Sequence, residues 1–217
     1  MANLRTGLYG TYCGSYFNES KHLTDSEMKT NATYLQKALS ARGWTKNAIA
    51  AILGNMQAES SINPGRWQSD SVGSYSLGYG LVQWTPVTKY TDWCTSNGYS
   101  DPSEIDANVA RIIYEVENRI QWYATAAYDM TFKEFTTSSQ DCGTLAKAFL
   151  LNYERPADQS SSVQEYRASL ARNWYTYLSD GSEPDIPIII PTNKRKKHRF
   201  NFILFNARNR RIKRGKT

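Results

Sequence analysis

The chain reads Leu53-Gly54-Asn55-Met56-Gln57-Ala58-Glu59-Ser60-Ser61-Ile62-Asn63-Pro64, which places Glu59 at the end of an apolar helix. Residues 48–53 favour a helix, and Asn63-Pro64 ends any helix that reaches it. A carboxyl held there lies partly in apolar packing and near the negative end of the helix dipole, and both effects disfavour its ionisation. Cleavage of a glycosidic bond needs such an acid to protonate the leaving oxygen. An ordinary solvated glutamate at a helix end is the alternative.

A second segment, Ser76-Leu77-Gly78-Tyr79-Gly80-Leu81-Val82-Gln83-Trp84-Thr85-Pro86, follows about twenty residues later. With it the chain resembles the lysozyme superfamily, in particular goose-type lysozymes and lytic transglycosylases, in which a Glu-Ser pair closes a helix and a Gly-Leu-x-Gln segment lines the opposite wall of the cleft. Its motifs are similar to those of the phage tail lysozyme family, found on the tail tips of short-tailed phages of Gram-positive hosts. The resemblance covers about residues 24–180 and extends to Tyr153-Glu154-Arg155-Pro156.

The resemblance implies a mainly α (α+β) fold, with a small β or loop wall at the cleft, and a set of site residues. Glu59 is the expected general acid. Gln83 would position a water or a sugar amide, and the Tyr153 hydroxyl would orient the acid, although a core role is nearly as plausible for Tyr153. The expected substrate-binding residues are Ser60, which has local capping bonds as its alternative, and Tyr79 and Trp84, which offer flat faces to sugar rings. For Trp67 core packing is the better interpretation.

The second carboxylate is left open by the sequence. Asp70 is the acid between Glu59 and Gln83, and a surface-turn role suits it equally well. Glu154 is expected to form a structural ion pair with Arg155 or Arg66. Without a second carboxylate, the substrate's own acetamide or release of an anhydro sugar would complete the reaction, so hydrolase and lytic transglycosylase remain open.

Helix signals follow one another along residues 23–180, the expected lysozyme-like domain. Thr24-Asp25-Ser26-Glu27 is a capping box for a helix that runs to about Arg42. Thr45 is expected to cap the helix that carries Glu59, and Thr85-Pro86 to open one that stops near Gly98. A helix capped at 103–106 follows, and two more are predicted over 141–153 and 162–178. Residues 60–84 predict the loop or β wall.

The two ends of the chain differ in composition from this domain. Residues 1–22 hold aromatic residues and glycines without helical periodicity and predict an N-terminal arm. Residues 181–193 contain prolines and predict a linker. Residues 194–217 carry eleven Lys and Arg and no acid, so the rest of the chain has 15 basic against 20 acidic residues of the total 26 and 20. The positive net charge therefore belongs to the tail, which favours attachment to an anionic or protein partner.

Three functions compete on this evidence. The leading one is a virion-associated muramidase on the phage tail, made in the host cytoplasm, that opens the host wall during infection. The second is an endolysin with the same chemistry, and the third is a structural virion or wall-binding protein with an inactive lysozyme fold. Expected partners are peptidoglycan glycan strands and virion proteins bound through residues 1–22 and 194–217, with nucleic acid a further candidate for the tail. The three cysteines and two histidines have no metal-binding spacing, so no metal or cofactor is expected, and no apolar run predicts an integral membrane segment.

Overall fold

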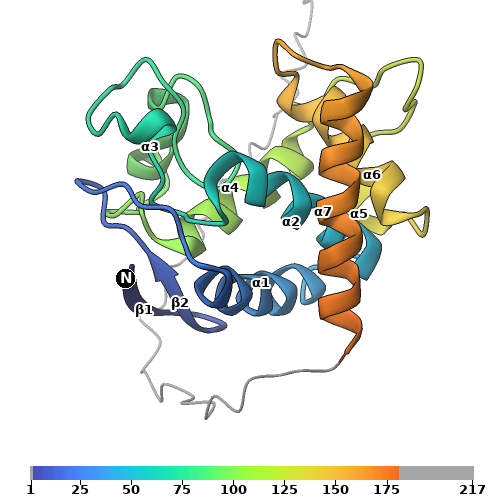
Figure 1. Ribbon diagram of the computed structural model, residues 1–217. Coiled ribbons are helices and arrows are strands. Elements are labelled where there is room, and N and C mark those ends of the chain that lie inside the picture. Colours follow the sequence, from blue (N-terminus) through green and yellow to red (C-terminus); the bar gives the residue numbers. More distant parts are fainter. Residues whose placement is uncertain (1, 181–217) are drawn as a thin grey trace, which may run out of the picture. The chain divides into compact units, whose positions relative to one another are not determined.

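The computed structural model describes residues 2–180, and these form a mainly helical unit with one small sheet (Figure 1). The mainly α class predicted from the sequence is confirmed. The linker predicted over 181–193 and the basic tail over 194–217 lie outside the described residues. Within residues 2–180 no helix has the length and apolar character needed to cross a bilayer. The elements in order are β1 (Asn3–Gly7), β2 (Gly10–Gly14), α1 (Asp25–Ser40), α2 (Lys46–Ser60), η1 (Gln68–Asp70), α3 (Thr88–Ser96), α4 (Ile105–Asn118), α5 (Phe132–Thr137), α6 (Cys142–Phe149), η2 (Leu150–Glu154) and α7 (Ser161–Ser179).

The first two helices begin where their caps predict. The Thr24 hydroxyl accepts from the Glu27 amide and the Glu27 carboxylate accepts from the Thr24 amide, which completes the capping box of α1. Thr45 accepts from the amide of Ala48 at the start of α2. Local hydrogen bonding at these positions therefore agrees with the tertiary fold.

Other helix boundaries differ from the sequence predictions. Helix α3 begins at Thr88, after Val87, rather than at Thr85-Pro86. Helix α4 starts after Glu104, because the Ser103 hydroxyl is engaged with Asp101 and supplies no cap. The short helix α5 was not predicted from the sequence, although Thr131 and Glu134 form a second capping box at its start.

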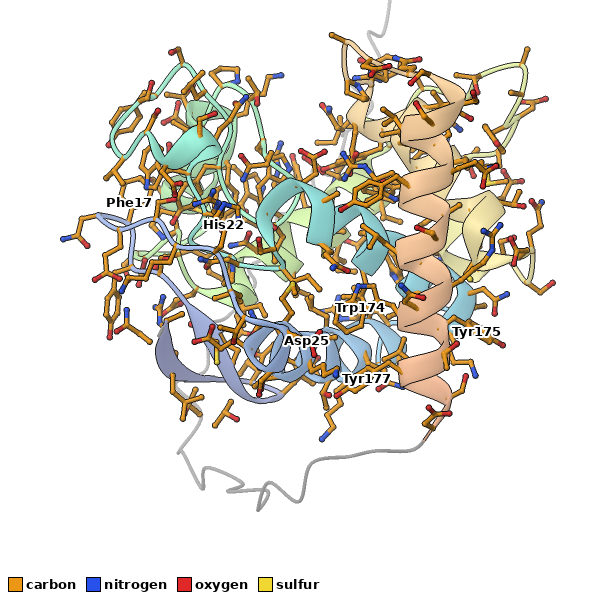
Figure 2. All side chains as sticks on the ribbon, viewed as in Figure 1. Phe17, His22, Asp25, Trp174, Tyr175 and Tyr177 are labelled. Atoms are coloured by element: carbon orange, nitrogen blue, oxygen red, sulfur yellow. The ribbon has the colours of Figure 1, made fainter. Side chains whose placement is uncertain are left out.

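Helix α2 runs through the core and fixes the position of Glu59. Every side chain from Ala48 to Met56 is buried, and α2 packs along α7, α6 and α1 (Figure 1). Figure 2 shows Trp174 and Tyr177 pointing from α7 toward α1 and α2. The Trp174 indole N–H donates to Oε1 of Gln57 at 2.8 Å. The last turn of α2 is therefore held from the side by α7.

The wall opposite this helix end is a loop over residues 61–84 built on aromatic side chains. Isolated β-bridges join Trp67 to Tyr79 and Tyr79 to Trp84. The Trp67 and Tyr79 rings lie 4.9 Å apart, and Trp84 stacks on Tyr90 of α3 at 4.4 Å. Packing between rings therefore holds this wall together with backbone hydrogen bonds, such as the pair that Tyr79 and Trp84 exchange.

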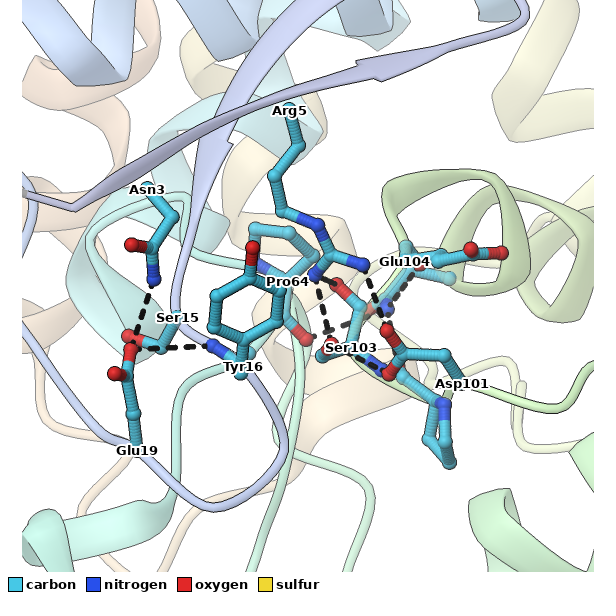
Figure 3. A network of polar contacts seen from close by, with 12 residues as sticks. Asn3, Arg5, Ser15, Tyr16, Glu19, Pro64, Asp101, Ser103 and Glu104 are labelled. Carbon is cyan, nitrogen blue, oxygen red and sulfur yellow. Dashed lines mark hydrogen bonds and ion pairs between the residues drawn. The ribbon is translucent and has the colours of Figure 1, made fainter.

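Residues 3–14, which the sequence placed in a separate N-terminal arm, form an antiparallel hairpin that packs against α1 in the same compact unit. Tyr12 is buried in the core. Arg5 reaches the loop before α4, where it donates to Asp101 at 2.7 Å and to the Ser103 hydroxyl at 2.7 Å (Figure 3). Alternation of exposed and inward side chains along β1, which helical periodicity does not detect, accounts for the difference.

Candidate active site

A cleft of about 540 Å³ lies between the end of α2 and the loop wall. Its loop side is formed by residues 66, 68–69 and 82–85, with Lys89 from α3. The opposite side holds Glu59 and residues 153–156, with Gln121 nearby. The cleft thus brings residues 59–89 together with Gln121 and residues 153–156, which lie far from them in the sequence.

Glu59 occupies the last turn of α2 and lines this cleft. Its side chain is 22% exposed, so the carboxyl meets both the protein interior and the solvent of the cleft. The helix ends one residue later because Ser61 and Ile62 have left-handed backbone conformations, with φ of 54° and 53°. The chain then turns away at Asn63-Pro64 and leaves the face of Glu59 open.

Arg167 of α7 holds the Glu59 carboxylate in place. One guanidinium nitrogen, Nη2, donates to Oε1 of Glu59, and Nη1 donates to the Asn55 carbonyl at 2.9 Å. Gly54 makes this contact feasible, because a Cβ at that position would lie 2.6 Å from the Ala171 backbone nitrogen. The missing side chain lets α7 approach α2 closely enough for Arg167 to span both groups.

Glu154 meets Glu59 from the other side, at the end of the π-helical turn η2. Its side chain is 5% exposed, and its Oε2 lies 3.8 Å from Nη2 of Arg167. Both Glu154 oxygens are buried, and no group of residues 2–180 donates a hydrogen bond to either of them. A buried carboxylate without donors is costly, so this position disfavours the charged form of Glu154.

The surroundings of Glu154 favour its protonated form. Burial raises its pKa well above the ordinary glutamate range, and the neighbouring charge of Glu59 raises it further. The Arg167 guanidinium acts in the opposite direction but does not cancel these effects. The two carboxyls and one guanidinium therefore form a cluster that is electrically neutral when it holds one proton.

The predicted partners of Glu154 were wrong. The guanidinium of Arg155 lies over the Tyr123 ring, 4.2 Å from its centroid. Arg66 pairs with Asp70 in the wall loop. Glu154 instead lies beside Arg167, because the end of η2 buries its carboxyl near the guanidinium that α7 supplies.

Asp70 lies in the wall loop but is not among the residues that line the cleft. Its side chain is 54% exposed and its carboxylate accepts from Arg66. The hydrogen bond from Arg66 is the largest effect that lowers the Asp70 pKa. The structure therefore does not bring Asp70 to Glu59 as a second carboxylate.

Gln83 lines the cleft, as the resemblance implied. Its Nε2 donates to the Gly80 carbonyl at 2.8 Å and to the Arg66 carbonyl at 3.2 Å. Its Oε1 is buried and has no hydrogen-bond partner in the described part of the chain. The amide group is thus fixed by the wall, with one acceptor still unpaired.

Tyr153 contacts a different carboxylate from the one expected. Its hydroxyl donates to Oε2 of Glu115 at 2.5 Å, while Trp84 and Arg111 donate to Oε1 at 3.0 and 2.9 Å. Burial raises the pKa of Glu115, and these donors partly offset the effect. The expectation that the Tyr153 hydroxyl orients Glu59 is therefore wrong, although Tyr153 and Trp84 both line the cleft.

The remaining predicted binding residues are buried. The Ser60 hydroxyl donates to the carbonyls of Met56 and Leu81, each at 2.9 Å, so its local bonds are confirmed and it does not face the cleft. Tyr79 is fully buried among aromatic rings rather than open to a sugar. Trp67 packs in the core, as predicted.

His22, which the sequence placed outside the domain, touches the wall loop (Figure 2). Its Nδ1 lies 2.8 Å from the Ser61 hydroxyl and its Nε2 lies 2.6 Å from Nη2 of Arg66. The segment after the hairpin therefore supports the wall from behind.

Two features of the central cluster were not predicted from the sequence. They are the contact of Arg167 with Glu59 and the position of Glu154 beside Arg167. A signal for the arginine was present, because Arg167 shares a helical face with Ala171, Trp174 and Leu178, and a charged residue on a buried face needs a partner. No pattern in the sequence indicated which acid that partner would be.

A mainly helical domain in which an acid at a helix end faces a loop wall across a cleft belongs to the lysozyme-like class. Comparison with known proteins agrees with the lysozyme-like class and identifies the family within it. Residues 30–178 match the phage tail lysozyme family, to which this chain belongs. The chain is also similar to Morphogenesis protein 1 of Bacillus phage B103, with 46% identity over 164 residues. That match covers 76% of this chain and 43% of the relative, so the chain spans less than half of that protein's length.

Proposed function

We propose that the chain is a virion-associated muramidase that cleaves the bond between N-acetylmuramic acid and N-acetylglucosamine, with Glu59 as the general acid. The observation that carries this proposal is the placement of Glu59 at the cleft, next to an arginine that also lies beside the buried carboxyl of Glu154. Family membership supports peptidoglycan as the substrate.

The acid acts on the oxygen that joins the two sugars. Glu59 gives its proton to this oxygen while the bond to the muramic acid carbon breaks, and the electron pair of that bond stays with the oxygen. The sugar carbon gains positive charge and needs a partner. Among the residues that line the cleft, the carboxylates are Glu59 and Glu154.

Glu154 is poorly suited to act as that partner, because its side chain is 5% exposed and its surroundings favour the protonated form. In glycosidases that retain configuration the two carboxyls lie about 5 Å apart, and in those that invert it the separation is larger, because a sugar carbon or a water must fit between them. The Oε2 atom of Glu154 instead lies 3.8 Å from the same Arg167 nitrogen that donates to Glu59, on the interior side of the cleft. We therefore favour attack by the substrate's own acetamide or by a hydroxyl of the muramic acid, the latter giving an anhydro product.

Replacement of Glu59 by glutamine tests the role of the acid. The amide has nearly the same size but no acidic proton, and loss of general acid catalysis costs on the order of 10² to 10⁴ in rate. We expect this loss in the rate at which suspensions of Gram-positive cell walls clear, with the circular dichroism spectrum unchanged. Asp70→Asn is the matched control, and we expect it to clear walls within about threefold of the wild-type rate. Wild-type clearing by Glu59→Gln would refute the mechanism.

Assignment to the virion is a further part of the proposal. It rests on the family and on the relative's printed name, which refers to morphogenesis. Purified particles that contain the protein at a defined copy number would support a role in infection. Detection only in the lysate, with particles free of it, would favour an endolysin.

A further inference from the structure

We infer that Glu154 is a positioning residue for Glu59, with which it shares a single proton while Arg167 balances the remaining negative charge. This inference rests on the proposed function and assigns a role to a residue that neither family membership nor the relative's name specifies. It explains how an acid that contacts an arginine can still supply a proton to a sugar.

The Arg167 guanidinium lies beside both carboxyls of the pair. Arg167 alone would hold Glu59 as a carboxylate, because Nη2 donates directly to Oε1 of Glu59. The same nitrogen lies 3.8 Å from Oε2 of Glu154. The guanidinium therefore stabilises a negative charge on either carboxyl, and transfer of the proton between them leaves the charge of the cluster unchanged.

The two acids differ in their exposure to the cleft, and this difference gives them different roles. The Glu154 side chain is 5% exposed and the Glu59 side chain is 22% exposed, so only Glu59 is well placed to reach a sugar in the cleft. Glu154 holds the proton at rest. When Glu59 gives a proton to the glycosidic oxygen, the proton of the pair is consumed, and the water or hydroxyl that adds to the sugar carbon returns one.

The charges that act on Glu154 come from the cluster itself. Glu59 and Arg167 are the charges that act on Glu154. Elsewhere in the cleft Arg66 is paired with Asp70, and Arg155 lies over the Tyr123 ring. The remaining charged groups near the cleft are Lys89 of α3 and, behind Tyr153, Glu115 with its partner Arg111.

The pH dependence of wall clearing distinguishes a shared proton from a purely structural contact. In Glu154→Gln the like charge disappears while the Arg167 cation remains, so the acid loses its proton at lower pH. We expect the alkaline limb of the pH–rate profile to move to lower pH by at least one unit, with activity recovering in acid. Removal of the cation in Arg167→Gln should move the same limb to higher pH, and Arg167→Lys should keep it near the wild-type position.

A uniform fall in rate at every pH, with no movement of the limb in Glu154→Gln, would overturn the inference. A second measurement does not depend on activity. In protein labelled with ¹³C at the glutamate carboxyls, we expect a resonance that titrates above the ordinary glutamate range and is absent from Glu154→Gln. The Glu115 resonance should stay in both spectra as an internal control. If the wild type cuts no glycan but this resonance behaves as stated, the proposed function is refuted and the shared proton is supported. If Glu59→Gln is inactive but the resonance is absent from the wild type, only the shared proton is refuted.

Discussion

The two sides of the cleft are built in different ways. The side that carries the acid consists of the ends of α2 and η2 and the middle of α7, where charged groups are held by close helix packing at Gly54. The wall over residues 61–84 is a loop supported by packed aromatic rings, with Gln83 at the cleft. The proposed acid therefore lies on a side built from packed helices, whereas Gln83 lies on a side built from a loop. The difference predicts that small changes in helix packing will affect catalysis more than changes in the loop.

The largest effect is expected from Gly54→Ala. The added methyl group would lie 2.6 Å from the Ala171 nitrogen and 3.0 Å from the Arg167 carbonyl, so α7 must move away from α2. Overpacking of this kind costs about 1 to 3 kcal/mol of unfolding free energy. A displacement of Arg167 by about 1 Å should also lower the clearing rate on the order of 10²-fold at temperatures where the variant is folded.

Chemical denaturation and wall clearing, measured on the same preparation of Gly54→Ala, would check both effects. Gly54→Val should be worse in both, because its side chain is larger. A fully active and stable Gly54→Ala variant would show that the acid side tolerates movement, and the comparison between the two sides would fail.

A smaller effect is expected from Tyr153→Phe, which removes the donor to Oε2 of Glu115 but keeps the ring. Loss of a buried hydrogen bond to a charged group should lower the free energy of unfolding by about 1.5 to 3 kcal/mol. The clearing rate at saturating wall concentration should stay within about threefold of wild type, because the hydroxyl does not touch Glu59. A rate loss as large as that of Glu59→Gln, without loss of stability, would restore the catalytic role first expected of Tyr153.

The third effect is a slope against pH rather than a single value. The pKa of Glu154 is raised in the folded protein, so above the ordinary glutamate range the folded state keeps a proton that the unfolded chain has lost. Stability must then fall as pH rises, by up to about 1.4 kcal/mol per pH unit, until the raised pKa is passed. In Glu154→Gln this contribution is absent, so its unfolding free energy minus that of wild type should increase from about pH 5 upward. A difference that stays constant with pH would mean that Glu154 is ionised in the folded state.

The sequence predicted the helical class, the caps at Thr24 and Thr45, and the position of Glu59 at a helix end, because these depend on local chemistry. The placement of Gln83 in the cleft followed from the family motif. The pairing of Glu154 with Arg167 rather than with Arg155 or Arg66 is not predictable from local sequence, because it depends on the approach of α7 to η2. Asp70 and Tyr79 are residue types that suit a sugar site, but no local pattern indicates that Asp70 pairs with Arg66 and that Tyr79 packs in the core.

Mass spectrometry of the products released from purified peptidoglycan would show which bond the protein cuts. We predict fragments whose new end is muramic acid, without freed peptide stems or amino groups. Because Glu154, the other acid among the described residues that line the cleft, is buried and favours its protonated form, we further expect that end to be an anhydro sugar or a product with retained configuration. Cut peptide stems with intact glycan strands would contradict the account.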